Sequence, residues 1–352
     1  MILSKSCFLN KPKVKDVSKY ALVDLHLHVD GSMTPADVLE LARVGGVSLP
    51  TYDIEELRGM LEVPKHGLSL RAYLDRFRLP LAVMQTRRTI SLSVSRLIRR
   101  LDAAGLIYAE LRFAPQQHTA GGLTQAEVVE AAIEGLNESI SSGFKAQLIL
   151  CCMRGSGNEE ANRETARLAA LWLGKGVCAA DLAGAEADFP TAGYAGLCAY
   201  MREIGVPFTI HAGEAVGPES VMLALDYGAS RIGHGIRCYN DPLSKARLRE
   251  MGVPLEICPT SNLDTRALPS VTRFEDYPIQ DFIRDGVTVT INTDNMAVSA
   301  TTLAAEFSGL MGGLQLSESD AVQCVRNAVA AAFLPEAEKN ALLALAMSRI
   351  TL

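Results

Sequence analysis

The sequence predicts an α/β protein, a single TIM (β/α)8 barrel domain over residues 1–352, and three observations lead to this prediction. The chain of 352 residues is long enough for one such barrel of roughly 250 residues with insertions. Short apolar runs and helical patterns alternate along it, which is typical of a parallel sheet with helical crossovers. Ionisable residues also follow several of these runs, at the strand ends where barrel enzymes hold their catalytic groups.

Eight runs are short and apolar enough to predict strands. They are residues 21–29, 106–114, 146–153, 177–183, 207–212, 231–236, 254–258 and 287–293. Helical patterns fill the intervals, beginning with Thr34-Pro35, which offers an N-cap followed by proline in the first turn. Residues 126–140, 160–173 and 192–204 also predict helices, each leading to a glycine (Gly143, Gly174, Gly205) that can end it.

Two intervals predict additional helices. The insertion after the first strand, at about residues 33–100, is too long for one crossover and contains several helical pieces. One piece, residues 70–81, carries an apolar stripe formed by Tyr73, Leu74, Phe77 and Leu81. The pattern alone favours helices packed on the barrel rim over a cover for its mouth. Residues 301–334 and 337–347 predict closing helices at the C-terminal end.

The two ends of the chain favour a closed barrel over an open, doubly wound sheet. His26 and His28 lie in the first predicted strand, and Asp294 follows the eighth. Neighbouring strands are about 4.8 Å apart, so the first and eighth strands of a flat sheet would lie roughly 34 Å apart. If these residues share a metal ion, with bonds of about 2.0 to 2.2 Å, the two strands must be neighbours.

Composition limits the classes of partner and the cellular compartment that we expect for this protein. The formal net charge of -6 argues against nucleic acid, whose binding requires a Lys/Arg surface. The eight cysteines include no C-x-x-C pair, and several lie in apolar runs, which is typical of a reducing compartment. Because no apolar stretch reaches the length of a signal peptide or a membrane span, we expect a cytoplasmic protein without membrane partners. Nothing in the sequence indicates the oligomeric state.

The segment Asp24-Leu25-His26-Leu27-His28-Val29-Asp30 alternates polar and apolar residues. With a period of two, the acids and histidines face the barrel interior and the aliphatic residues face the helices. A single buried histidine is more often a hydrogen-bonded core residue than a ligand. A ligand role for the pair His26 and His28 is supported by ionisable residues at three later strand ends. These are His211 with Glu214, His234, and Asp294.

These residues predict a metal site. Three imidazoles and one carboxylate, from His26, His28, His211 and Asp294, suit one Zn²⁺ with a position left for water, and the same donors suit other first-row metals. Zinc lowers the pKa of a bound water to near neutrality and so supplies a nucleophile. His234 is expected to orient that water or take its proton. Glu214 could accept a hydrogen bond from a ligand histidine, but we favour a proton donor, which a neutral ring nitrogen requires.

Five buried charges in the predicted strands have no assigned catalytic role. They are Asp24, Glu110, Arg112, Asp181 and Glu256. They are as well explained by a polar layer behind the metal ligands as by an ion network in the barrel core.

Five segments together resemble the adenosine deaminase family of metal-dependent amidohydrolases. They are His26-Leu-His28-Val-Asp30-Gly31, Asp181-Leu-Ala-Gly184-Ala-Glu186, His211-Ala-Gly-Glu214, Gly233-His234-Gly235 and Thr293-Asp294. The resemblance extends in order from about Ala21 to beyond Phe307 and includes Glu110-Leu-Arg112-Phe-Ala-Pro115 and Cys258-Pro-Thr-Ser-Asn262.

The resemblance implies zinc-dependent hydrolytic deamination of adenosine and 2'-deoxyadenosine to the inosine forms, with water as co-substrate and release of ammonia. Metal-bound hydroxide is then expected to attack purine C6, while Glu214 protonates N1 and His234 and Asp294 position the water. The resemblance also makes the insertion at about 33–100 a cover over the pocket, against the preference from the pattern alone.

Four further residues take substrate-binding roles by the same resemblance. Gly184 is expected to offer its N–H to purine N3, and His28 and Asp30 are expected to lie beside the ribose. Asn295 stands where many members carry an aspartate that donates to purine N7. An amide donates as it stands, whereas a carboxyl must first be protonated, so we expect the asparagine to be tolerated.

Three alternatives stay open. A sister deaminase acting on adenine, a nucleotide or a modified adenosine would use the same mechanism, although Asp30 would repel a phosphate near the ribose 5' end. An ester or amide hydrolase on the same barrel has no need of Glu214. A binding protein without activity is the least favoured, since the metal, acid and water-orienting positions all carry competent residues.

Overall fold

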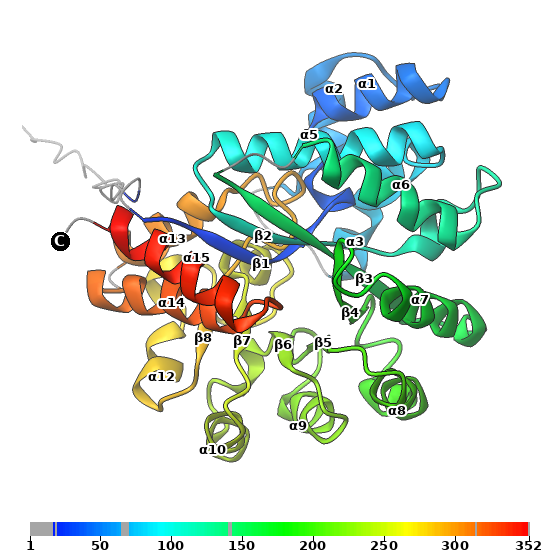
Figure 1. Cartoon of the computed structure of the whole chain (residues 1–352). Helices are drawn as coiled ribbons and strands as arrows, with labels where there is room; N and C mark the ends of the chain where they lie inside the picture. The colour runs from blue at the N-terminus through cyan, green and yellow to red at the C-terminus, as the bar shows by residue number, and fades with distance from the viewer. Residues whose placement is uncertain (1–16, 18–19, 65–69, 140–142, 314, 351–352) are drawn as a thin grey trace, which may run out of the picture.

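The computed structural model describes residues 17, 20–64, 70–139, 143–313 and 315–350 (Figure 1). Eight parallel strands form one sheet in sequence order. They are β1 (Val23–His28), β2 (Tyr108–Phe113), β3 (Lys145–Met153), β4 (Val177–Ala183), β5 (Phe208–Ala212), β6 (Arg231–His234), β7 (Leu255–Ile257) and β8 (Val289–Ile291). Each lies within its predicted run, apart from Lys145 at the start of β3.

The sheet closes between its first and last strands. The Asp294 N–H donates to the carbonyl of His26 over 2.8 Å, and the His28 N–H donates to the carbonyl of Asp294 over 2.7 Å. These bonds bring the segment after β8 beside β1 at the carboxyl ends of the strands. The predicted (β/α)8 barrel is therefore confirmed, and so is the adjacency of the two ends of the chain.

Helices surround the strands (Figure 1). In the first half of the chain these are α1 (Pro35–Gly45), α2 (Ile54–Leu61), α3 (Leu70–Leu74), α4 (Arg78–Val83), α5 (Arg87–Ala103), α6 (Gln125–Asn137) and α7 (Glu159–Leu171). The second half adds α8 (Ala195–Glu203), α9 (Pro218–Asp226), α10 (Pro242–Met251), α11 (Pro259–Asp264), α12 (Ile279–Arg284), α13 (Leu303–Gly312), α14 (Glu318–Ala331) and α15 (Glu336–Arg349).

Local signals account for several helix ends. The Thr34 side chain accepts a hydrogen bond from the Asp37 N–H, and the Asp37 side chain accepts one from the Thr34 N–H. This pair of bonds gives α1 the predicted N-cap. The helix predicted over 126–140 ends earlier, at Asn137, so Gly143 does not end it, and residues 140–142 lie outside the described residues. The piece predicted over 70–81 is divided into α3, a 3-10 turn over Asp75–Phe77 and α4. Pro80 accounts for part of this division, because it lacks an N–H and fits only the first turn of a helix.

Apolar side chains fill the space between strands and helices. Leu25 and Leu27 of β1 are fully buried in this core, while Asp24 and His26 are fully buried on the other face of the strand. The seven described cysteines are buried and form no disulfide bond, and Cys7 lies outside the described residues. In the part of the chain that the structure describes, no helix has both the length and the apolar character needed to span a membrane.

Candidate active site

Five side chains from four parts of the barrel converge at the carboxyl ends of the strands. They are His26 and His28 of β1, His211 of β5, His234 of β6 and Asp294 after β8. His28 Nε2 lies 3.2 Å from His211 Nε2 and 3.3 Å from Asp294 Oδ1. His26 Nε2 lies 3.4 Å from that same oxygen. One ligand atom from each of His26, His211, His234 and Asp294 lies within 4.8 Å of the others.

These distances fit a metal ion. Four bonds of about 2.1 Å directed to the corners of a tetrahedron place the ligand atoms about 3.4 Å apart. The three distances among His26, His28, His211 and Asp294 given above lie close to this value. His26 Nε2 is buried and has no hydrogen-bond partner among the described residues, which leaves its lone pair available for a cation.

The backbone is unusual where two of these side chains leave it. His234 has a φ of 62° and Asp294 a φ of 59°, both in the left-handed region that residues other than glycine seldom adopt. Such conformations persist where the surrounding structure holds them, and they concentrate at functional sites.

Buried carboxylates hold two of the histidines from behind. Glu256 Oε2 lies 2.7 Å from His26 Nδ1, and Asp181 Oδ2 lies 3.0 Å from His211 Nδ1. A carboxylate only accepts hydrogen bonds, so each Nδ1 carries the proton and each Nε2 lone pair points into the cluster.

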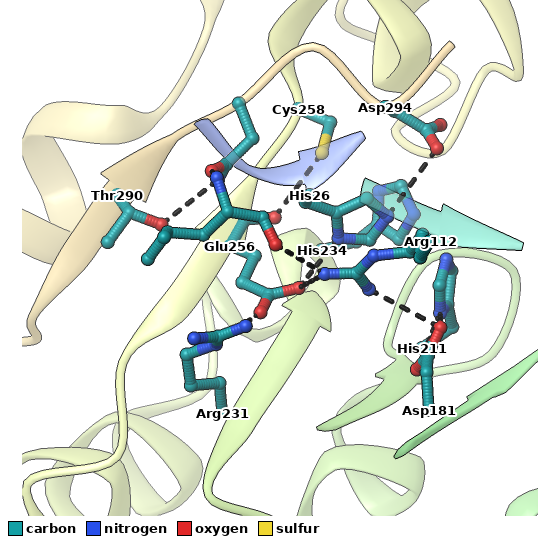
Figure 2. A network of polar contacts seen from close by, with 12 residues as sticks. His26, Arg112, Asp181, His211, Arg231, His234, Glu256, Cys258, Thr290 and Asp294 are labelled. Atoms are coloured by element: carbon teal, nitrogen blue, oxygen red, sulfur yellow. Dashed lines mark hydrogen bonds and ion pairs between the residues drawn. The ribbon is translucent and has the colours of Figure 1, made fainter. Parts of the chain in front are cut away.

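The same carboxylates belong to an ion network below the cluster (Figure 2). Arg112 Nη1 lies 3.3 Å from Asp181 Oδ2, and Arg112 Nη2 lies 3.0 Å from Glu256 Oε2. Arg231 Nε lies 2.6 Å from Glu256 Oε1, and Arg231 Nη2 lies 2.5 Å from Glu110 Oε2. All of these side chains are essentially inaccessible to solvent. For Asp181 and Glu256 the two explanations that the sequence left open therefore apply together, because each contacts a histidine of the cluster and an arginine of the network. Asp24 lies outside this network and accepts from the Thr293 hydroxyl.

Glu214 follows β5 and is 6% exposed. Its Oε1 lies 3.0 Å from Thr265 Oγ1, and its Oε2 lies 3.8 Å from His234 Nε2. Burial, followed by the charge of Asp294, raises the pKa of Glu214 to about 8. The carboxyl group is therefore protonated near neutral pH.

A cavity of about 260 Å³ opens above the cluster. The predicted site residues that line it are His28, Asp30, Gly184, His211, Glu214, His234, Asp294 and Asn295. His26 lies beneath them, fully buried. The stripe residues Tyr73, Leu74, Phe77 and Leu81 also line the cavity, so the 70–81 segment faces the site instead of packing only on the rim.

Asp30 and Asn295 are polar residues in the cavity wall, and their contacts indicate which of their atoms are available to a ligand. Asp30 accepts the Gly31 N–H over 3.0 Å, and burial raises the pKa of its carboxyl to about 6. Asn295 Oδ1 has no hydrogen-bond partner among the described residues and lies 1.8 Å from where a Cβ on Gly31 would stand. Because the amide oxygen lies against Gly31, the NH₂ group is the end that remains for a ligand.

Sequence reasoning gave no role to a second set of residues, on α11 and just after it. Ser261 Oγ donates to Asp294 Oδ2 over 2.5 Å, and Asn262 Nδ2 lies 3.0 Å from His234 Nδ1. With Thr265 beside Glu214, this short segment contacts three of the site side chains. The available signal was the polar run Pro259-Thr-Ser-Asn262, directly after the seventh predicted strand.

Comparisons with known proteins agree with this geometry. The profile of the family described as adenosine deaminase matches residues 21–348. An adenosine deaminase of Haemophilus ducreyi is 47% identical over 336 residues, which cover 94% of this chain and 97% of the relative. One from Enterococcus faecalis is 37% identical over 335 residues, with 95% and 97% covered. The crystal structure of an adenine deaminase from Arthrobacter aurescens superposes with a TM-score of 0.84 at 28% identity, covering 94% of this chain and 98% of that one.

Proposed function

The chain belongs to the adenosine deaminase family, and from this premise we propose that it deaminates adenosine and 2'-deoxyadenosine to inosine and 2'-deoxyinosine, with one Zn²⁺ per chain and water as co-substrate. It is thus a hydrolase that acts on carbon–nitrogen bonds. The observation that carries the proposal is the place of the buried Glu214 carboxyl group, whose pKa burial raises to about 8, in the wall of a cavity that also opens onto the histidine cluster.

We assign the zinc to His26, His28, His211 and Asp294, because the three ligand-atom distances known among them, 3.2, 3.3 and 3.4 Å, suit residues that would hold one ion. When bound, zinc lowers the pKa of water so that hydroxide is available at neutral pH. His234 and Asp294 orient the attacking oxygen toward C6 of the purine. Glu214 gives its proton to N1, which draws electron density away from C6 and makes that carbon more electrophilic.

Three hydrogen-bond donors in the cavity are proposed to bind the three ring nitrogens of the purine that can accept a hydrogen bond. The Gly184 N–H binds N3, the protonated Glu214 binds N1, and the Asn295 amide binds N7, while His28 and Asp30 lie beside the ribose. All five residues line the same cavity, which supports this placement.

The insertion is proposed to cover this cavity. Besides the four stripe residues in the lining, Tyr73 contributes a hydroxyl that lies 2.9 Å from that of Ser299, in the segment after β8. This contact ties the insertion to the segment after β8. Tyr73→Phe is expected to raise KM more than it lowers kcat.

The charges around the cavity favour a nucleoside over a nucleotide. Among the described residues, Arg154 is the only arginine or lysine in its lining. Its Nη1 donates to the carbonyl of Phe189 and its Nη2 to Thr191 and the carbonyl of His211, so those nitrogens are already engaged. The buried Asp30 carboxylate would oppose a phosphate further.

Free adenine is the second candidate substrate, because the adenine deaminase from Arthrobacter aurescens shares the fold at 28% identity. The test is to follow the ultraviolet change after mixing the metal-analysed protein with adenosine, 2'-deoxyadenosine, adenine or AMP. Turnover of the two nucleosides, with kcat of Glu214→Gln lower by about 10²- to 10⁴-fold, supports the proposal. Turnover of adenine alone would replace it, and rapid adenosine turnover by Glu214→Gln would remove the proton-donor assignment.

A further inference from the structure

One buried carboxylate near the cavity has no part in the mechanism above. Glu186 follows β4 and is 1% exposed, yet it does not line the cavity and contacts none of the proposed zinc ligands through its side chain. An isolated carboxylate is costly to bury unless hydrogen bonds or charges compensate it. Its partners therefore indicate what it does.

Glu186 accepts hydrogen bonds from four successive backbone N–H groups in the loop after β5. Its Oε1 accepts from Gly213 over 2.8 Å, and its Oε2 accepts from Glu214, Ala215 and Val216 over 3.1, 2.8 and 3.0 Å. The Ser220 hydroxyl adds a fifth bond of 2.5 Å to Oε1. The loop thus wraps its N–H groups around one anion, as backbone nests do around phosphate.

Gly213 makes this wrapping possible. Its φ is 71°, and a Cβ there would lie 2.7 Å from a methyl group of Val221. The chain can therefore reverse directly after β5 only with glycine at this position. The residue that follows the reversal is Glu214, so the anion that gathers the loop also determines where the Glu214 side chain begins.

A buried arginine compensates the charge through two hydroxyl groups. Ser220 Oγ lies 2.7 Å from Thr191 Oγ1, and Arg154 Nη2 donates to Thr191 Oγ1 over 2.9 Å. The same Arg154 nitrogen donates to the carbonyl of His211 over 2.7 Å. The network therefore holds β5 at its last residues and the loop immediately beyond it.

We propose that Glu186 is a positioning residue, which sets the place of the Glu214 carboxyl group by fixing the loop over residues 213–216. Glu186 stands two residues after Gly184, whose N–H is proposed to bind purine N3. The Glu186 side chain therefore links this segment to the loop that carries Glu214, the proposed donor to N1. The proposal rests on the proposed function of Glu214. A residue needed only for folding would affect stability and zinc content without a selective effect on the transition state.

Glu186→Gln is the sharpest test, because it keeps the shape and replaces one acceptor oxygen with an NH₂ group that faces backbone N–H donors. We expect zinc content to remain at one per chain, KM for adenosine to change less than about threefold, and kcat to fall about 10- to 100-fold, the cost of a small misplacement of a catalytic group. An analogue with a tetrahedral carbinol at the C6 position should lose affinity by the same factor, whereas inosine should not. Amide hydrogen exchange at 213–216 should be faster.

Glu219→Gln is the matched control, since this carboxylate is exposed at the start of α9 and lies outside the cavity lining. Ser220→Ala is the second variant, which removes one of the five bonds and should give a smaller effect with the same division between kcat and KM. It decides the question if Glu186→Gln does not fold. Unchanged kcat with faster exchange at 213–216, or a loss of activity that follows zinc content alone, would overturn the proposal.

The same experiment separates this inference from the proposed function. A wild-type protein without activity on adenosine would refute the proposed substrate, while exchange at 213–216 would still report on Glu186. An active wild type with kcat unchanged in the folded Glu186→Gln and Ser220→Ala variants would refute only the positioning role.

Discussion

Glu256 Oε2 accepts the Nδ1–H of His26 over 2.7 Å, and this contact determines which nitrogen of the ring is free to bind a metal. Although burial alone would raise it, the charges of Arg112 and Arg231 keep the pKa of Glu256 well below its usual range. A permanently ionised carboxylate keeps the proton on Nδ1 and so leaves the Nε2 lone pair directed at the cluster.

Glu256→Gln should therefore weaken zinc binding. Loss of a carboxylate behind a ligand histidine typically costs about 10- to 100-fold in metal affinity, which competition with a chelator will measure. The same change leaves Arg112 and Arg231 short of a buried partner, so the free energy of unfolding should fall by about 3–5 kcal/mol in denaturant titrations. Zinc affinity equal to that of the exposed control Glu219→Gln would show that Glu256 has no role in metal binding.

Glu214→Gln should abolish most of the activity and change how stability depends on pH. Activity should fall by about 10²- to 10⁴-fold, the usual contribution of a general acid, as measured by kcat for adenosine. In the folded protein the pKa of Glu214 is raised to about 8 from the usual 4.5, chiefly by burial. The folded state therefore retains a proton that the unfolded chain releases, and stability falls as the pH rises through this window.

The glutamine variant cannot ionise and should escape that loss. In metal-free protein its stability relative to wild type should increase between pH 5 and pH 8, by at most about 1.4 kcal/mol per pH unit. Denaturant titrations at pH 5, 6.5 and 8 provide the measurement. A stability difference that stays constant with pH would mean that Glu214 is ionised throughout and has no proton to give.

The sequence predicted the barrel and the central cluster because both depend on local patterns. A histidine or aspartate within or directly after an apolar strand is conspicuous, and the alternation in β1 places His26 and Asp24 on one face whatever surrounds them. The strand ends were less accurate, since β7 and β8 are only three residues each and stop where their neighbours stop pairing.

The supporting residues could not be predicted in the same way. Asn262, Ser261 and Thr265 are ordinary polar residues in sequence, and only the packing of α11 against the site buries them. Glu186 lies in a recognisable segment, yet its role depends on a loop almost 30 residues later in the chain. The apolar stripe at 70–81 was visible, but whether it faced the rim or the cavity depended on contacts with distant strands.

Asn295→Ala should weaken substrate binding or turnover well beyond its effect on fold stability. The amide oxygen of Asn295 lies against Gly31, so the NH₂ group is the end proposed to reach purine N7. Inosine should bind about 5- to 100-fold more weakly to the variant, the range expected when a buried acceptor loses its donor. The 7-deaza analogue, which lacks the N7 acceptor, should bind equally well to both proteins. Unchanged adenosine kinetics, or an equal loss for both ligands, would remove this role.

Asn262→Asp should change the tautomer of His234. Tyr277 donates its hydroxyl to Asn262 Oδ1 over 2.7 Å, which turns the NH₂ end of the amide toward His234 Nδ1, 3.0 Å away. His234 Nδ1 then accepts, so its proton lies on Nε2, which faces Glu214 and the cluster. This arrangement favours an orienting donor over a base that takes the proton of water, the choice that the sequence left open.

An aspartate at this position would accept from Nδ1–H and move the proton away from the cluster. We expect kcat to fall about 10²-fold, as when one donor to a developing charge is lost, while zinc content remains unchanged. Nitrogen-15 chemical shifts of the His234 ring should report Nε2–H in the wild type and Nδ1–H, or a doubly protonated ring, in the variant. Asn327→Asp, on α14 with its amide on the Val289 carbonyl, is the control. An Nδ1–H ring in the wild type would reverse the assignment and make His234 the base.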